Sequence, residues 1–239
     1  MIKRIFKRIW AYWFYICFSA IFLFFYPLFF FLLLNKKSYS FVSKLRRLWA
    51  KLILLLMGIR MDVSFEKLLS NNERYIFMSN HTSYLDIPCF AYAVKGYLHF
   101  MAKAELTKIP LFNIFFSTID IAIDRNSNID SYRAFQKAAD NLNNGKSIVI
   151  FPEGGTSGRN YQLQNFKKQP FMLAIETGTP IVPVTFLDNW HLFLDDGCNF
   201  ARPGSSRAIF YEPISTDKIN IEGAEDLKQK VFDIIINLY

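Results

Sequence analysis

The sequence YIFMSNHTSYLDIP, residues 75–88, changes at Ser79 from an apolar run to a polar loop. The apolar run is short enough to be a buried strand. Proline is tolerated in a helix only within its first turn, so Pro88 indicates that a helix begins close to Asp86. The stretch therefore predicts a strand, a loop and a helix in immediate succession.

The rest of the chain repeats this alternation. The predicted strands cover residues 75–79, 98–102, 118–123, 147–151, 181–186 and 207–211, and the predicted helices cover residues 131–144, residues 167–177 and the stretch from Ala224 onward. Strands that alternate with helices predict an α/β fold with a mostly parallel sheet flanked by helices. Prolines bracket the strand at residues 181–184, which is typical of an edge strand or of the start of a parallel strand. Ligands of such sheets bind in loops beyond the strand ends, so the functional residues are expected there.

The N-terminal third has a different composition. Residues 10–34 contain no charged side chain, and as a helix they would reach about 37 Å, enough to cross the hydrocarbon of a bilayer. Basic residues flank this run on both sides: Lys3, Arg4, Lys7, Arg8, Lys36 and Lys37. Because Pro27 lies inside it, a kinked or re-entrant hairpin is an alternative to a straight span. The run predicts a membrane anchor at residues 9–34.

A second helical pattern follows the anchor. Apolar residues recur at helical spacing at Phe41, Leu45, Leu48, Trp49, Leu52 and Leu56, and the basic residues Lys44, Arg46, Arg47 and Lys51 fall on the other side. This pattern is typical of a helix in an anionic interface, although an amphipathic helix packed on its own domain has the same pattern. The chain thus divides into an anchoring helical segment, residues 1–60, and a soluble-type domain, residues 61–239.

Composition limits the classes of partner. The net charge is +8, which suits nucleic acid, an anionic membrane or a phosphate ester. No nucleic-acid-binding motif accompanies that charge, so a nucleic-acid partner is not expected. The three cysteines are far apart and have no Cys/His ligand spacing, which argues against a disulfide framework or a zinc site.

The loop after the first predicted strand carries the strongest chemical signal. Histidine is the natural general base at neutral pH, and a carboxylate beside its second nitrogen fixes the tautomer. Side chains five residues apart do not meet within one helix, so a His81–Asp86 pair requires His81 in the turn and Asp86 at the helix start. A plainer alternative is that Ser83 or Asp86 only caps the helix and that His81 is a polar turn residue.

Two more loops carry candidate residues. Arg125 follows the predicted strand 118–123 and can grip a phosphate with two hydrogen bonds, or else form a surface salt bridge with Asp124. The loop FPEGGTSGR, residues 151–159, has three glycines and two hydroxyls after a strand. It can form a nest of backbone donors for an oxyanion, or be a flexible turn. It is neither a nucleotide-binding P-loop nor the nucleophile elbow of hydrolases.

Taken in order, these segments resemble the 1-acyl-sn-glycerol-3-phosphate acyltransferases and their glycerolipid acyltransferase relatives. Residues 80–86 match the NHxSxxD motif, residues 119–125 resemble the second motif, residues 151–157 the third, FPEGTRS, and residues 181–184 the fourth. The stretches MAKAELTKIPLF, residues 101–112, and FKK, residues 166–168, also resemble the family. The resemblance covers residues 60 to 215, and the ordered set outweighs the plainer alternatives.

The resemblance implies an enzyme that moves a fatty acyl group from an acyl thioester, acyl-CoA or acyl carrier protein, to the sn-2 hydroxyl of 1-acyl-sn-glycerol-3-phosphate. The product would be phosphatidic acid, made in phospholipid biosynthesis. His81 would be the general base and Asp86 would orient it, with direct transfer and no acyl-enzyme. The implied substrate-binding residues are Lys103, Arg125, Glu153, Gly154, Gly155, Thr156, Ser157 and Arg159. No metal and no bound cofactor are implied, and the partners are the bilayer, a lysophospholipid acceptor and the acyl donor, with the catalytic domain on the cytoplasmic face.

The sequence departs from the family at two places. The third motif reads EGGTS, so Thr156 stands where the family has arginine, and Asn113 stands where glycine is common. These departures keep open an acyltransferase of the same family that acts on another hydroxyl-bearing lipid, such as a lyso-aminolipid. A lipase or thioesterase, and a non-catalytic basic binder, are the alternatives from other functional classes.

Overall fold

The computed structural model describes residues 2–70, 72–156, 162–194 and 200–237, with side chains from residue 5 onward. Within these ranges the strands form a seven-stranded sheet in the order β1-β7-β6-β2-β5-β3-β4. The strands are β1 (Ile59–Phe65), β2 (Ile76–Ser79), β3 (Leu98–Lys103), β4 (Ile121–Ile123), β5 (Ser147–Ile150), β6 (Ile181–Phe186) and β7 (Gly204–Phe210). Strands β6, β2, β5, β3 and β4 are parallel, whereas β7 is antiparallel to β6 and β1 is parallel to β7. The mostly parallel sheet flanked by helices is confirmed.

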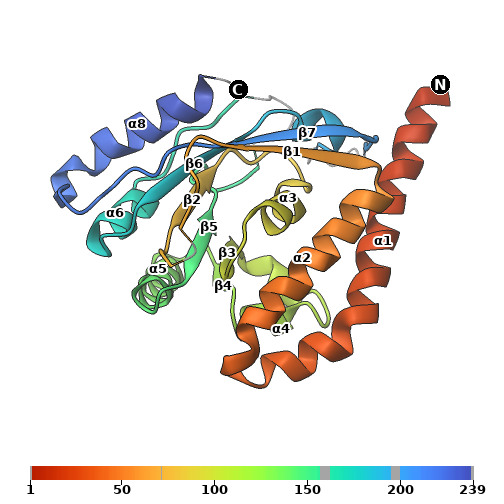
Figure 1. Cartoon of the computed structure of the whole chain (residues 1–239), viewed down its shortest axis with the longest axis horizontal. Helices are drawn as coiled ribbons and strands as arrows, with labels where there is room; N and C mark the ends of the chain where they lie inside the picture. Colours follow the sequence, from red (N-terminus) through yellow and green to blue (C-terminus); the bar gives the residue numbers. More distant parts are fainter. Residues whose placement is uncertain (1, 71, 157–161, 195–199, 238–239) are drawn as a thin grey trace.

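The helices cover both faces of this sheet (Figure 1). They are α1 (Ile2–Leu33), α2 (Tyr39–Leu56), α3 (Asp86–Ala93), α4 (Asn113–Phe116), α5 (Asn128–Asn143), α6 (Gln169–Glu176), α7 (Asn189–Leu192) and α8 (Ala224–Ile236), with short 3₁₀ turns at Lys36–Ser38, Ala104–Lys108 and Ile221–Gly223. Helices α1, α2 and α3 lie on one face of the sheet, and α5, α6 and α8 lie on the other.

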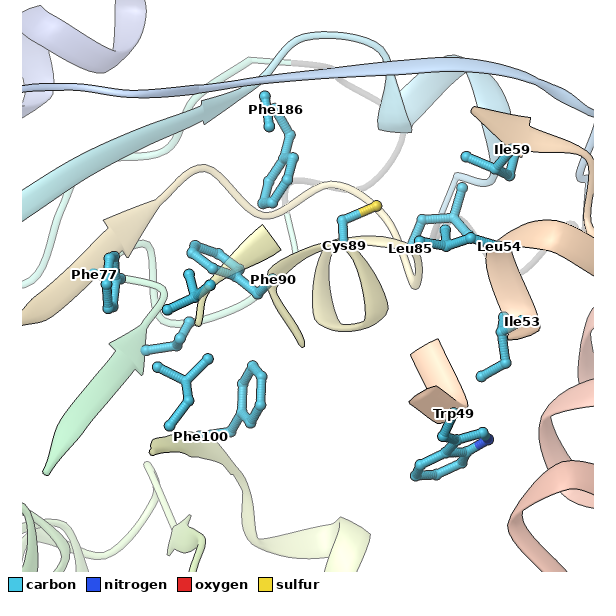
Figure 2. Close-up of a cluster of buried hydrophobic side chains, with 14 of the residues drawn as sticks. Trp49, Ile53, Leu54, Ile59, Phe77, Leu85, Cys89, Phe90, Phe100 and Phe186 are labelled. Carbon is cyan, nitrogen blue, oxygen red and sulfur yellow. The ribbon is translucent and has the colours of Figure 1, made fainter. Parts of the chain in front are cut away.

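The inner strands β2, β5 and β6 bury both of their faces, and successive side chains point to opposite faces of the sheet. In β2, Phe77 joins the core under α1, α2 and α3, whereas Ile76 and Met78 join the core under α5, α6 and α8. Figure 2 shows part of the first core, where side chains of α2 lie in the same buried cluster as those of α3 and the sheet: Trp49, Ile53, Leu54, Ile59, Phe77, Leu85, Cys89, Phe90, Phe100 and Phe186. The N-terminal segment therefore shares a core with the sheet domain.

The N-terminal segment is a pair of antiparallel helices. Pro27 lies inside α1 without ending it. The indole nitrogens of Trp10 and Trp13 donate to the carbonyls of Met57 and Leu56, at 3.2 and 3.0 Å, which ties the start of α1 to the end of α2. By length and composition, residues 5–33 of α1 suffice to cross a membrane, and only 22% of its most apolar window is buried. The division at residue 60 falls inside β1, and the separate roles assigned to its two sides remain a prediction.

The expected orientation of α2 is wrong in one respect. Arg46, placed on the polar side by the sequence pattern, is buried, whereas Phe41, Leu48 and Leu56 of the apolar side are 56%, 44% and 44% exposed. The helix is rotated because Arg46 pairs with the carboxylate of Asp120 inside the protein. The alternative of an amphipathic helix packed on its own domain describes α2 better, since its buried face contacts α3 and the sheet.

Two features of the predicted strands need correction. Strand β1 was not predicted, and its pairing with β7 extends that strand back to Gly204. Residues 118–120 are not in β4, because the amides of Ile119 and Asp120 both donate to the carbonyl of Phe115, each at 2.8 Å, and prolong the turn after α4. Of the two alternatives for residues 181–184, the parallel strand is confirmed: β6 lies between β7 and β2 and pairs in parallel with β2.

Candidate active site

The first part of the site is the point where the chain leaves β2. Asn80 follows the strand, and its side chain continues the ladder to β6: Nδ2 donates to the carbonyl of Phe186 and Oδ1 accepts from the amide of Phe186, both at 2.9 Å. This two-way pairing takes the place of a backbone pair and fixes the direction in which the next residue emerges. That residue is His81.

His81 and Asp86 meet across the loop between β2 and α3. His81 Nδ1 lies 2.8 Å from Asp86 Oδ2, and Asp86 is the first residue of α3. The amides of Thr82 and Ser83 donate to the same oxygen at 3.0 Å, so the loop wraps around the carboxylate. The structure therefore brings the predicted pair together, with His81 in the turn and Asp86 at the helix start. Because Nδ1 faces Asp86, Nε2 is the ring nitrogen left for a substrate.

The surroundings of His81 are partly apolar. Its ring stacks on Phe151, with centroids 3.9 Å apart and planes at 18°. Phe151 in turn packs edge-on against Phe90 of α3. The side chain of His81 keeps 19% of its surface exposed, whereas Asp86 is fully buried. His81 is therefore reachable from solvent, whereas Asp86 is not.

Glu153 joins the first motif to the third. Its Oε1 accepts from the amide of His81 at 2.8 Å, and its Oε2 accepts from the amide of Gln164 at 2.9 Å. Glu153 is 3% exposed. Its carboxylate thus holds the backbone of His81 against the loop that follows β5, which is compatible with the site-shaping role expected of it.

Arg125 and Lys103 lie at the ends of neighbouring strands. Arg125, just beyond β4, donates to the carbonyl of Gly154, in the loop after β5, and is not paired with Asp124 in the described structure. Burial lowers the pKa of the Arg125 guanidinium from its usual value. Lys103, the last residue of β3, pairs with Glu105 at 2.9 Å, with both side chains exposed. The strand order β2-β5-β3-β4 places these two cations on the same side of His81.

The glycine loop bends sharply next to Arg125. Gly154 has φ of +78°, a conformation that favours glycine. A Cβ on Gly155 would lie 4.0 Å from Arg125 Nη1, so the loop and the guanidinium are in contact. The carbonyl of Thr156 accepts from the side-chain amide of Gln164 at 3.4 Å. Ser157 and Arg159, also predicted as substrate-binding residues, lie outside the described residues.

One residue of this site was missed by the sequence reasoning. Asn189, the first residue of α7, donates from Nδ2 to Asp86 Oδ1 at 2.8 Å and is fully buried. The two residues are 103 positions apart, and no motif contains Asn189. The available signal was its position just beyond β6, the strand beside β2, where a parallel sheet places its functional residues.

The chain is similar to several known proteins. The acyltransferase family model matches residues 60–187. A chloroplastic 1-acyl-sn-glycerol-3-phosphate acyltransferase of Brassica napus is 27% identical over 192 residues, which cover 78% of this chain and 53% of that protein. One from Borreliella burgdorferi is 32% identical over 145 residues, covering 60% and 58%. The crystal structure of the 1-acyl-sn-glycerophosphate acyltransferase PlsC from Thermotoga maritima superposes with a TM-score of 0.83 at 25% identity, covering 98% of this chain and 95% of that one.

The extent of these matches sets what they establish. The chain spans about half the length of the two curated relatives, 53% and 58%. The family model, by contrast, covers more than half of this chain and includes His81, Asp86, Arg125 and the loop after β5. The chain belongs to the acyltransferase family.

Proposed function

We propose that this protein transfers a fatty acyl group from an acyl thioester to the sn-2 hydroxyl of 1-acyl-sn-glycerol-3-phosphate, giving phosphatidic acid. The observation that carries the proposal is the 2.8 Å contact between His81 and Asp86 at the end of β2, on the side of the sheet where Arg125 reaches the loop after β5. The relatives from Brassica napus and Borreliella burgdorferi, both named as 1-acyl-sn-glycerol-3-phosphate acyltransferases, support this acceptor.

The reaction needs one proton carrier. His81 Nε2 takes the proton of the acceptor hydroxyl, and the oxygen forms a bond to the thioester carbonyl carbon. The carbon–sulfur bond then breaks, and the thiolate leaves with the proton that His81 returns. Asp86 holds the ring and stabilises the imidazolium between these two steps. Backbone amides near the loop after β5 would stabilise the oxyanion of the tetrahedral intermediate.

Arg125 is the proposed partner of the acceptor's phosphate. It follows β4 but contacts Gly154, whose loop follows β5, and β5 pairs directly with β2. Neighbouring strands are about 5 Å apart, so the guanidinium lies close to His81, which follows the carboxyl end of β2. Only a few bonds separate the phosphate of the acceptor from its sn-2 hydroxyl, which fits this spacing. Lys103 is a second cation at this edge, and we include Gly155, Thr156, Ser157 and Arg159 in the proposed acceptor site.

The donor and the membrane complete the proposal. Acyl-CoA or acyl carrier protein would supply the thioester, with no metal or tightly bound cofactor. Helix α1 presents large apolar side chains to the outside: Ile5, Phe6, Ile9, Tyr12, Trp13, Ile16, Leu23, Phe24, Leu28, Phe30 and Phe31. These would sit in the bilayer, with Lys7, Arg8, Lys36 and Lys37 against anionic head groups and the catalytic domain on the cytoplasmic face. A fixed enzyme then meets two acyl-bearing substrates at high local concentration.

A second acceptor class is favoured by one observation. Thr156 stands where the family's third motif has arginine, so the acceptor head group has one cation fewer at that position. The alternative is therefore acyl transfer to another hydroxyl-bearing lipid, such as a lyso-aminolipid, by the same His81 chemistry.

Acyl transfer by the purified, detergent-solubilised protein tests both versions. The protein receives labelled acyl-CoA or acyl carrier protein with lysophosphatidic acid or with a panel of other hydroxyl-bearing lipids. His81→Ala is the test variant, and His191→Ala, at an exposed histidine, is its control. Lysophosphatidic acid conversion that His81→Ala abolishes and His191→Ala keeps supports the proposal. If only another lipid is converted, the alternative acceptor replaces lysophosphatidic acid. If His81→Ala keeps most of the transfer rate, both the proposal and its alternative are overturned.

A further inference from the structure

The hydrogen bonds around Asp86 continue beyond the His81 pair. Asn189 Nδ2 donates to Asp86 Oδ1 at 2.8 Å, and Ser206 Oγ donates to Asn189 Oδ1 at 2.6 Å. Asp86, Asn189 and Ser206 are all 0% exposed. A continuous chain of hydrogen bonds therefore runs from His81 through Asp86 and Asn189 to Ser206. It joins the loop after β2 to α7 and β7.

The orientation of the Asn189 amide is determined from both ends. A carboxylate only accepts hydrogen bonds, so the amide nitrogen must face Asp86. The amide oxygen then faces Ser206, whose hydroxyl supplies the matching donor. Cys89 Sγ lies 3.7 Å from Ser206 Oγ and 4.0 Å from Asn189 Oδ1. Burial raises the pKa of the Cys89 thiol to about 12, so this neighbour stays neutral and adds no charge.

The two carboxylate oxygens of Asp86 accept different numbers of hydrogen bonds. Oδ2 accepts from three groups: His81 Nδ1 and the amides of Thr82 and Ser83. Oδ1 accepts from Asn189. Leaving a buried carboxylate oxygen without a donor is costly, and a carboxylate held at one oxygen can still rotate. Asn189 thus supplies the bond that satisfies Oδ1 and stops the rotation.

We propose that Asn189, oriented by Ser206, is a positioning residue for the His81–Asp86 pair. It touches neither acceptor nor thioester, and it acts by keeping Asp86 Oδ2 on His81 Nδ1 while the imidazolium forms. This inference rests on the proposed function of His81 as the base.

Two substitutions of Asn189 separate positioning from folding. Asn189→Leu keeps the branched shape of the side chain but removes the donor, and kcat should fall roughly 10- to 100-fold with KM for the acceptor little changed. Asn189→Asp places a second carboxylate beside Asp86, and two such buried groups hold one proton between them. That proton restores the donor at low pH and is lost at high pH. The rate of Asn189→Asp relative to the unsubstituted protein should therefore fall as pH rises, a trend that a folding defect alone does not produce.

Ser206 provides the second test and its own control. Ser206→Ala removes the donor that orients the amide, and kcat should fall severalfold, whereas Ser206→Thr keeps a hydroxyl and should restore it. Ser205→Ala, at the exposed neighbour on the same strand, should leave kcat unchanged. These variants keep the inference testable if Asn189→Leu does not fold.

The experiment measures kcat, KM and thermal unfolding of the detergent-solubilised variants between about pH 6 and 9. A selective loss of kcat, the pH trend of Asn189→Asp and rescue by Ser206→Thr are expected. If His81→Ala is inactive but folded Asn189→Leu has the kcat of the unsubstituted protein, the inference is overturned. If Asn189→Leu does not fold, an unchanged kcat in Ser206→Ala overturns it instead. If His81→Ala is active, the proposed function itself has failed, so the two failures are distinguished.

Discussion

Arg46 of α2 and Asp120, just before β4, form a buried two-bond ion pair, with Arg46 Nη1 3.1 Å from Asp120 Oδ1 and Nη2 bonded to Oδ2. Asp120 Oδ1 also accepts from the amide of Phe100 in β3 at 2.9 Å. The guanidinium lies 4.2 Å from the ring centroid of Phe115. This pair connects the N-terminal helices to the strand that leads into Arg125.

Breaking the pair should cost far more than breaking a surface pair. Arg46→Ala leaves the Asp120 carboxylate buried and partly unpaired, so the free energy of unfolding should fall by about 3–5 kcal/mol. Arg133→Ala is the matched control, since Arg133 and Asp130 are exposed and 3.3 Å apart, and it should cost less than about 1 kcal/mol. Urea unfolding in detergent measures both. Equal losses in the two variants would contradict a structural role for the buried pair.

Local pattern and turn chemistry predicted much of the fold, and long-range contacts account for what it missed. The strand–loop–helix at residues 75–88 was found because Pro88 marks a helix start, and β2 and α3 lie there. In strand β1 every second residue is apolar and points to one face: Ile59, Met61, Val63 and Phe65. This period of two is a strand signal, but it directly follows the helical pattern of residues 41–56. The rotation of α2 depends on Asp120, 74 residues away, which no helical pattern contains.

Local sequence patterns also predicted only the short-range contacts of the site. His81 and Asp86 are five residues apart, so their pairing could be tested against loop and helix geometry. Glu153 and Asn189 contact them from 72 and 103 residues away. The sequence placed Glu153 near a strand end and did not single out Asn189, and a strand-end position does not specify which atoms meet. The buried role of Asn189 follows only from the packing of α7 against the loop after β2.

Glu153 should be sensitive even to an isosteric change. Glu153→Gln keeps the volume but leaves one acceptor oxygen for the amides of His81 and Gln164. One of these part-buried amides then loses its partner at a cost of about 1–3 kcal/mol, and kcat/KM should fall roughly 10- to 100-fold if that loss appears in the transition state. Steady-state kinetics measure this. Wild-type kinetics in Glu153→Gln would show that the carboxylate is not needed to place His81.

His99 should make stability depend on pH. It is 1% exposed, and burial lowers its pKa to about 4, although Asp120 and the carbonyl of Ile119 act in the opposite direction and Lys146 and Arg46 add to the lowering. The ordinary value is 6.5. Between the two values the unfolded chain binds a proton that the folded chain does not, so stability is lost as pH falls from about 6.5 toward 4 and is fully present above that window.

Substitution of His99 by glutamine removes this titration and keeps a donor for the carbonyl of Ile119. Between pH 7 and 5 the unsubstituted protein should lose about 2 kcal/mol more unfolding free energy than His99→Gln. Unfolding curves at the two pH values measure the difference. The same pH slope in both proteins would mean that other groups govern the acid sensitivity.

Arg125 should affect the acceptor more than the chemistry. Arg125→Lys keeps one positive charge but not the planar fork that binds a phosphate through two hydrogen bonds. KM for lysophosphatidic acid should rise about tenfold, with a smaller change in kcat. Lys103→Ala, at a lysine paired with Glu105, should have a smaller effect. A KM effect that persists with an acceptor lacking the phosphate would contradict the proposed contact.

The exposed stripe on α1 should control membrane attachment. Phe24, Leu28 and Phe31 are 78%, 48% and 68% exposed and lie one above another at helical spacing. Burying one phenylalanine in an apolar phase contributes about 1.5–3 kcal/mol, so Phe24→Ser with Phe31→Ser should weaken vesicle binding at least tenfold. Co-flotation with vesicles of phosphatidylcholine and phosphatidylglycerol measures this binding. The substitutions leave the net charge of the protein unchanged. Leu68→Ser, at a residue 89% exposed in the loop after β1, is the control and should bind normally. If it weakens binding as much as the double variant, apolar surface in general, and not α1, governs attachment.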